Sequence, residues 1–304
     1  MWYVYALIGP AIWGFLNHVD KYLLGRFFKG EAAGPVLTVF TGFAGILVAA
    51  LILLFGPPVF TLAPGQAFFV MLAGVLMVGS YVPYMIALQR DETSIVASLY
   101  RLTPVFVFAL SYVVLGESLR PRQIVGGLVV IAGSILLIVD PDRRGRGLRF
   151  STFFLMCLAC LMNACTVVIF KTVALNGSFW RTAFWQYVGT GLFSLAVIGL
   201  VPSYRRALLT VLRSGGAAAL VPMTLSAEGM NLVANLAVNF AGLIAPLALV
   251  SIVTGLHPLF VFAYGVLFTL FLPRFGRESL GHRHILQRVI AIGVMCIGMI
   301  ITFT

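Results

Sequence analysis

The chain is organised around apolar segments that are long enough to cross a lipid bilayer. About 20 consecutive apolar residues span the hydrocarbon layer as a helix. A window of that length finds ten such segments, near residues 3–24, 35–55, 66–88, 94–115, 122–139, 151–171, 181–201, 216–240, 246–272 and 285–303. The connections between them are too short for a soluble catalytic domain. The sequence therefore predicts an all-α polytopic membrane protein with ten transmembrane helices.

The composition agrees with a membrane protein and argues against a nucleic-acid-binding one. Hydrophobic residues make up 61% of the 304 residues and charged residues only 10%, whereas a soluble domain of this length needs a more polar surface. The net charge of +11 comes mostly from basic residues between apolar segments, where they fix topology and attract anionic lipid. We expect membrane lipids, and no nucleic acid, as partners. The N-terminus lacks a basic region and a small-residue cleavage site, so we expect no cleavable signal peptide.

The cysteines do not indicate a metal centre. Cys157 and Cys160 have the C-x-x-C spacing that holds zinc when a second ligand pair is present. No such pair is visible, and the motif lies inside an apolar segment. We interpret these cysteines as small hydrophobic packing residues and expect no metal and no cofactor.

Sequence similarity between the two halves of the chain indicates an internal repeat. "TPVFVFAL" at 103–110 resembles "HPLFVFAY" at 257–264, and the E-S-L of residues 117–119 recurs at residues 278–280 after a longer connection. The same alignment pairs Lys21 with Lys171. Each half, 1–140 and 151–304, then holds five helices, with a basic connector at 141–150. An odd number of helices makes the halves cross the membrane in opposite directions, and transporters with such inverted repeats bind substrate where the repeats meet.

The two five-helix halves, the proline-centred fourth helix and "LGESLRPRQIVGGLVVIAGSILL" resemble the EamA-type transporters of the drug/metabolite transporter superfamily. The G-E-x-L turn is kept at Gly116, Glu117 and Leu119, whereas Arg277 replaces the glycine in the second half. The resemblance covers nearly the whole chain. It implies a secondary transporter, commonly an exporter of amino acids or other small metabolites, with a central cavity lined by both halves.

The distribution of basic residues predicts the orientation. With ten helices, both termini share one side, and that side has only Arg120, Arg122, Lys171 and Arg181 among the connection residues. The opposite side carries most of the basic charge, and the positive-inside rule assigns it to the cytoplasm. We therefore expect a multi-pass protein of the plasma membrane, which in a bacterium is the inner membrane. Both termini should lie on the outer side of this membrane. The resemblance implies termini inside, and we favour the charge distribution.

A polar stripe in the first segment predicts part of a cavity wall. Trp13, Asn17 and Asp20 share one helix face through three- and four-residue spacings, and a carboxylate gains nothing from anionic headgroups. We expect Asp20 to face protein. Lys21 is near the helix end, where it can reach lipid phosphates, and we expect His18, on another face, at the membrane interface.

The eighth segment has the clearest polar face. Glu228, Asn231, Asn235 and Asn239 recur at intervals of three, four and four residues, which places them on one side of a helix. Such groups face the bundle interior rather than lipid. The asparagines either bind substrate or join helices by hydrogen bonds. Glu228, as an intramembrane carboxylate, is our candidate for proton coupling.

The third segment predicts an aromatic wall opposite this polar face. The repeat alignment places Met77, Tyr81 and Tyr84 where the second half has Asn231, Asn235 and Val238. Aromatic and polar walls together suit an amphiphilic small molecule. The alternative is that the tyrosines lie at the membrane interface or pack as core.

The fourth and ninth segments supply two further candidates, each close to a proline. Arg101 lies three residues before Pro104, and a buried guanidinium can hold a carboxylate or phosphate with two hydrogen bonds. His257 immediately precedes Pro258 and can titrate, or can be satisfied by backbone as a core residue. Pro83, like these two prolines, permits a helix bend. We predict that Arg101 and Glu228 lie close together, directly or through water or substrate.

These residues predict a secondary active transporter of a small metabolite, amino-acid-like or amphiphilic, working by proton-coupled export as a monomer or homodimer. The alternative within transport is a flippase for a lipid-linked or phosphate-bearing substrate. An enzyme is the least favoured class. The D-x-D of Asp140 and Asp142 could hold a cation, but it is followed by "RRGRGLR" and is typical of a charged connector.

Overall fold

The computed structural model describes residues 1–27, 33–91, 93–138, 149–213, 217–271 and 282–304. Within these ranges the chain forms helices and no strand, as the apolar segments predict. The helices are α1 (Trp2–Phe27), α2 (Ala33–Phe55), the 3-10 turn η1 (Val59–Thr61), α3 (Pro64–Gly79), α4 (Tyr81–Arg90), α5 (Thr93–Tyr100), α6 (Thr103–Leu115), α7 (Pro121–Ile138), α8 (Phe150–Leu175), α9 (Phe179–Leu200), α10 (Pro202–Leu212), α11 (Ala217–Ile244), α12 (Leu247–Thr254), α13 (His257–Phe271) and α14 (His282–Phe303).

Three of the predicted segments are each divided into two consecutive helices. α3 ends and α4 begins around Ser80, α5 and α6 are separated by Arg101 and Leu102, and α12 and α13 are separated by Gly255 and Leu256. Each break lies within three residues before Pro83, Pro104 or Pro258. Proline lacks an N–H group and clashes with the carbonyl one turn earlier, so the preceding turn is interrupted. The predicted bends are therefore confirmed at all three positions.

Eight segments of the described chain are long and apolar enough to cross a membrane, as single helices or as the pairs α3–α4, α5–α6 and α12–α13. α1 and α11 are not among the eight. α1 carries Asn17 and Asp20, and α11 carries Glu228 with three asparagines. Crossing by these two helices, and hence the total of ten, stays a prediction.

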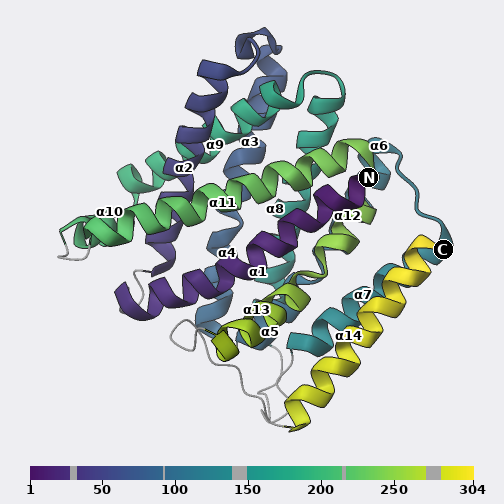
Figure 1. Ribbon diagram of the computed structural model, residues 1–304. Helices are drawn as coiled ribbons and strands as arrows, with labels where there is room; N and C mark the ends of the chain where they lie inside the picture. Colours follow the sequence, from purple (N-terminus) through teal and green to yellow (C-terminus); the bar gives the residue numbers. More distant parts are fainter. Residues whose placement is uncertain (28–32, 92, 139–148, 214–216, 272–281) are drawn as a thin grey trace.

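The helices pair across the two halves of the chain in a reciprocal way. α7 packs along α14, and α2 along α9, so that helices at equivalent positions in the predicted repeats meet. α1 contacts α11 and α13, and in the same way α8 contacts α3, α4 and α6. Two equivalent five-helix halves would produce this pattern, although the inverted repeat and its boundaries stay predictions. Figure 1 shows α1 and α11 running side by side through the middle of the molecule and α7 with α14 along one edge.

Close contact between α7 and α14 explains why the end of the first half is rich in glycine. A Cβ atom on Gly126 would collide with the carbonyl of Gly298 and with Thr302, and one on Gly298 would collide with the backbone of Val130. Small residues allow helix backbones in membranes to approach this closely. The glycines therefore fix the contact between the last helix of each half.

The two ends of the chain lie on the same side of the molecule, as predicted. The ring of Trp2, at the start of α1, packs 5.7 Å from the ring of Phe303, at the end of α14, and Figure 1 shows both termini at one edge. We call this the terminal side, and the opposite side, where α1 ends and α2 begins, the connection side. Which of the two faces the cytoplasm stays a prediction from charge.

One helix was missed by the sequence prediction. α10 follows α9 after a single residue and buries Ala207, Leu208 and Val211 against α1, α2 and α11 on the connection side. Its other face exposes Arg205 and Arg206. A helix of 11 residues is too short to appear in a search for membrane spans,.

Candidate functional site

A cavity of about 520 Å³ lies between the two halves of the chain. Pockets of 300–1,000 Å³ are typical of small-molecule sites. The structure brings every sequence-predicted site residue to its wall: Trp13, Asn17, Asp20, Tyr81, Tyr84, Arg101, Glu228, Asn231, Asn235 and His257. Their roles in binding or coupling stay predictions.

The cavity extends from the middle of the bundle along the connection-side part of α1 and α2. α1 lines it with residues from Trp13 to Asp20, and α2 lines it with Thr38 and Thr41, close to its first residue. On the terminal side, Ala6 of α1 packs instead with Ala241 and other buried apolar residues. The two ends of the bundle therefore differ, and the terminal end is filled.

The polar face of α11 forms one hydrogen-bonded chain around Asn231. Its Nδ2 donates to Glu228 Oε2 at 3.1 Å, and its Oδ1 accepts from Trp13 Nε1 at 3.0 Å and from Asn235 Nδ2 at 3.1 Å. Glu228 is thus held by an amide donor, and α1 is joined to α11 at the cavity wall. Asn231 therefore joins helices, which is one of the two alternatives raised by the sequence, and it also lines the cavity, where substrate binding stays a prediction.

The other two asparagines of this face behave differently from each other. Asn239 Nδ2 donates to Gln186 Oε1 of α9 at 3.2 Å, which is the helix-joining role. Asn235 donates within α11, to Asn231 Oδ1 and also to the Asn231 carbonyl at 2.8 Å. Gln186 also lines the cavity and was missed by sequence reasoning, although a glutamine in the middle of an apolar helix was a usable signal.

A second chain joins the two proline breaks. Arg101 Nη2 lies 3.2 Å from Nδ1 of His257, whose Nε2 lies 2.9 Å from the side-chain amide of Asn17. A guanidinium can only donate, so Nδ1 of His257 is the acceptor of this contact,. The Nε of Arg101 is buried and has no hydrogen-bond partner. One donor of the guanidinium is therefore left for another acceptor.

Arg101 and Glu228 line the same cavity, but no direct ion pair joins them in the described residues. Arg101 contacts His257 instead, and Glu228 contacts Asn231. The carboxylates of Glu228 and Asp20 are close enough to influence each other electrostatically. The predicted pairing is therefore absent as a direct contact, and the cavity holds separate acidic and basic positions.

Tyrosines form much of the wall near Arg101. The rings of Tyr84 and Tyr100 meet edge to face with centroids 5.7 Å apart, and the Tyr100 hydroxyl accepts from Asn163 Nδ2 at 3.3 Å. Tyr81 and Tyr84 line the cavity, as predicted from their alignment with the polar face of α11. Tyr100 and Asn163 were missed, and the adjacency of Tyr100 to Arg101 was the available signal.

Two expectations for α1 have opposite outcomes. His18 is not at the membrane interface: it is only 5% exposed, its Nε2 lies 2.9 Å from the Val261 carbonyl of α13, and its ring meets that of Phe268. The interfacial expectation was wrong because the face of α1 that carries His18 packs against α13. Lys21 is exposed near the end of α1, as expected.

Of the two sequence motifs considered for metal binding, the structure describes only the C-x-x-C of Cys157 and Cys160. Cys157 and Cys160 are free, and Cys160 packs with its Sγ 3.4 Å from the Thr103 hydroxyl. The described residues include no group of three potential metal ligands. Asp140 and Asp142 lie outside the described residues.

Comparison with known proteins finds a family similarity for the first part of the chain. Residues 1–139 match the model of the EamA-like transporter family, which confirms the resemblance to EamA-type transporters over this part of the chain. No curated protein matches the chain. A solved structure titled "Crystal structure of protein" superposes with a TM-score of 0.71 over 99% of this chain and 97% of its own, at 15% identity. At that identity the likeness concerns the fold alone. The family match points to a multi-pass membrane transporter of small solutes.

Proposed function

We propose that this protein is a secondary active transporter that exports a small zwitterionic or amphiphilic solute, such as an amino acid, with proton coupling. The observation that carries the proposal is the charge layout of the cavity. Arg101 occupies one position and the pair Asp20 and Glu228 another, with no ion pair between them in the described residues. Isolated charges are costly at membrane depth, so both positions favour a ligand that brings the opposite charge.

A zwitterion satisfies both positions at once. Its carboxylate accepts from the guanidinium of Arg101, which has an unused Nε–H, and its ammonium group faces Asp20 and Glu228. Tyr81, Tyr84 and Trp13 offer aromatic surface to the remaining apolar part. Charge-assisted hydrogen bonds of this kind are stronger than neutral ones.

Proton coupling is assigned to Glu228. Its carboxylate accepts from the neutral amide of Asn231, and no ion pair to it is found among the described residues. A carboxyl group in such surroundings can take up a proton when the ammonium group of the substrate leaves. Two features support the export direction: the cavity extends toward the connection side, and the distribution of basic residues predicts that this side faces the cytoplasm.

The test is substrate-specific transport by the purified protein in liposomes. Zwitterionic amino acids should show saturable counterflow, and an imposed pH gradient should drive their accumulation. A pool of labelled anionic and cationic analogues serves as the control, because each satisfies only one of the two charged positions. Uptake that does not exceed that of protein-free liposomes for any zwitterion would refute the proposal.

The flippase alternative is less well supported by the cavity. A phosphate-bearing headgroup would meet Arg101 but also two carboxylates, and like charges repel across a site of low dielectric constant. Protein-dependent translocation of a labelled phospholipid, with no amino acid counterflow, would favour the flippase.

A further inference from the structure

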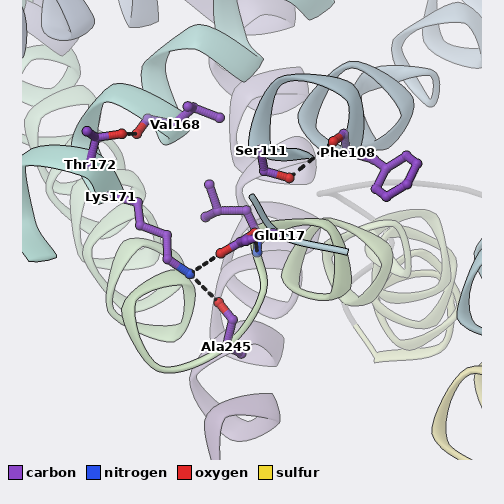
Figure 2. Close-up of polar contacts among 8 residues, drawn as sticks. Phe108, Ser111, Glu117, Val168, Lys171, Thr172 and Ala245 are labelled. Carbon is purple, nitrogen blue, oxygen red and sulfur yellow. Dashed lines mark hydrogen bonds and ion pairs between the residues drawn. The ribbon is translucent and has the colours of Figure 1, made fainter. Parts of the chain in front are cut away.

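A buried ion pair at the terminal side joins the two halves of the chain. Lys171 Nζ, near the end of α8, lies 2.5 Å from Glu117 Oε1, in the turn after α6, and the two side chains are 8% and 14% exposed. Figure 2 shows the lysine reaching from α8 toward this turn. Glu117 belongs to the first half and Lys171 to the second. The transport mechanism proposed above makes no use of either residue.

Both side chains also bind the backbone where α11 gives way to α12. Glu117 Oε2 accepts from the N–H of Leu247 at 2.8 Å, and Lys171 Nζ donates to the carbonyl of Ala245 at 2.7 Å. Groups at helix ends have no partner within the helix, and Pro246 between them has no N–H to offer. The ion pair therefore fastens the junction of two cavity-lining helices to α8 and α6.

The turn that carries Glu117 is fixed by Gly116. This glycine has a φ of 67°, a left-handed conformation that glycine adopts without steric cost. Its N–H donates to the Tyr112 carbonyl at 3.1 Å, and the N–H of Glu117 donates to Ser111 at 3.2 Å. The G-E sequence thus ends α6 and directs the carboxylate toward α8.

The ion pair lies beyond the terminal end of the cavity. The cavity-lining residues of α11 end at Asn239, and those of α12 begin at Ser251, on either side of the junction that the pair holds. Around the junction, Ala245 packs with Ala6, Ala241 and Val250 in a buried apolar cluster. Glu117 and Lys171 are therefore placed to hold this end of the bundle together.

We propose that the Glu117–Lys171 ion pair is the latch of the terminal-side gate, and that solute leaves toward this side only when the pair separates. The proposal rests on the transport function proposed above. A buried ion pair favours two discrete arrangements, one with the pair closed and one with the two charges separated and hydrated. Partial opening is disfavoured, because it leaves two uncompensated charges without water. The backbone contacts of both residues transmit the separation to α11 and α12, which carry Glu228 and Ser251.

Thiol labelling tests the latch without measuring transport. The four native cysteines are replaced by alanine, and Val238 on the cavity wall is replaced by cysteine. A membrane-impermeant maleimide is then applied from the terminal side, which is identified by a tag at Thr304. The double variant Glu117→Gln/Lys171→Gln removes both charges while keeping an acceptor for Leu247 and a donor for Ala245. Its terminal-side labelling rate should exceed that of the parent at least about fivefold.

Thr172→Val is the matched control, because Thr172 neighbours Lys171 and its hydroxyl bonds only within α8, to Val168 at 2.8 Å. Its labelling rate should equal that of the parent. If the first double variant does not reach the membrane, Glu117→Gln/Lys171→Met replaces it and buries no polar group at position 171. Unchanged terminal-side labelling in a folded, charge-free variant overturns the latch. Faster labelling in a protein that moves no solute overturns the transport proposal alone.

Discussion

Arg101 and His257 lie 156 residues apart in the chain, yet Nη2 of the arginine is 3.2 Å from Nδ1 of the histidine. Each lies immediately at a proline-induced helix break, one in the first half and one in the second. The interruption of the helix brings their side chains to the middle of the bundle. The only cationic side chain among the described cavity-lining residues is therefore held by both halves.

Replacement of Arg101 should weaken substrate binding. Arg101→Lys keeps the charge but loses the planar fork, and Arg101→Gln loses both. Hydrogen bonds to charged groups contribute about 1.5–3 kcal/mol, so Arg101→Gln should raise the Kd of a zwitterion about 10- to 100-fold, with Arg101→Lys between it and wild type. Equilibrium binding of a labelled amino acid measures this. Arg149→Gln, at an exposed position just before α8, is the control, and equal affinities would contradict the role of Arg101.

Glu228→Gln should separate transport from its driving force. Glutamine still accepts a hydrogen bond from Asn231 but cannot carry a proton at this position. Counterflow at equal pH should persist, while accumulation driven by a pH gradient should be lost. Both are measured in liposomes with the same preparation, so that counterflow reports folding. Gradient-driven accumulation at the wild-type level would rule out Glu228 as the coupling residue.

Asn231 should matter more for stability than Asn235. Asn231→Leu leaves Trp13 Nε1 and Glu228 without their amide partners, and each unsatisfied buried group costs about 1–3 kcal/mol. Asn235→Leu removes bonds that lie within α11. Thermal unfolding in detergent should therefore give a clearly lower Tm for Asn231→Leu. The reverse order would show that the bond between α1 and α11 contributes little.

The glycines of α7 should not tolerate side chains. Gly126→Val would force α7 away from Gly298 and Thr302 of α14, and overpacking of this kind costs about 1–3 kcal/mol or more. Gly199→Ala, at a position of α9 with no atom near the added Cβ, should be neutral or slightly stabilising. Unfolding curves of the two variants measure the difference. Equal stability would mean that α7 and α14 adjust without cost.

The orientation can be checked with a single tag. The basic residues of the connection side predict that Thr304 is outside the cell. A C-terminal epitope should react with antibody in intact spheroplasts to the same extent as after permeabilisation. A tag shielded until permeabilisation would reverse the orientation, and with it the export direction that we propose.

Most of the helix positions and the cavity face of α11 could be predicted because they are recorded in local sequence patterns. The length of the apolar segments predicted the helices, and the prolines predicted the three helix breaks. The spacing of Glu228, Asn231 and Asn235 predicted the polar face of α11. The pairing of Lys171 with Glu117 could not be predicted, because no local periodicity links residues 54 positions apart. His18 was misplaced for a related reason, since burial against α13 depends on the packing of distant helices. α10 was missed because its short amphipathic pattern has no membrane-spanning length.

The contacts between the two halves have a consequence for how such a chain can change during evolution. Arg101 comes from one half of the gene and its contact His257 from the other, and the same holds for Trp13 with Asn231 and for Glu117 with Lys171. Each of these three contacts needs one residue from each half. Two fragments expressed separately, 1–140 and 151–304, would therefore have to reassociate before either could work. A mutation that alters substrate preference in one half is therefore constrained by a partner residue encoded some 50 to 220 codons away.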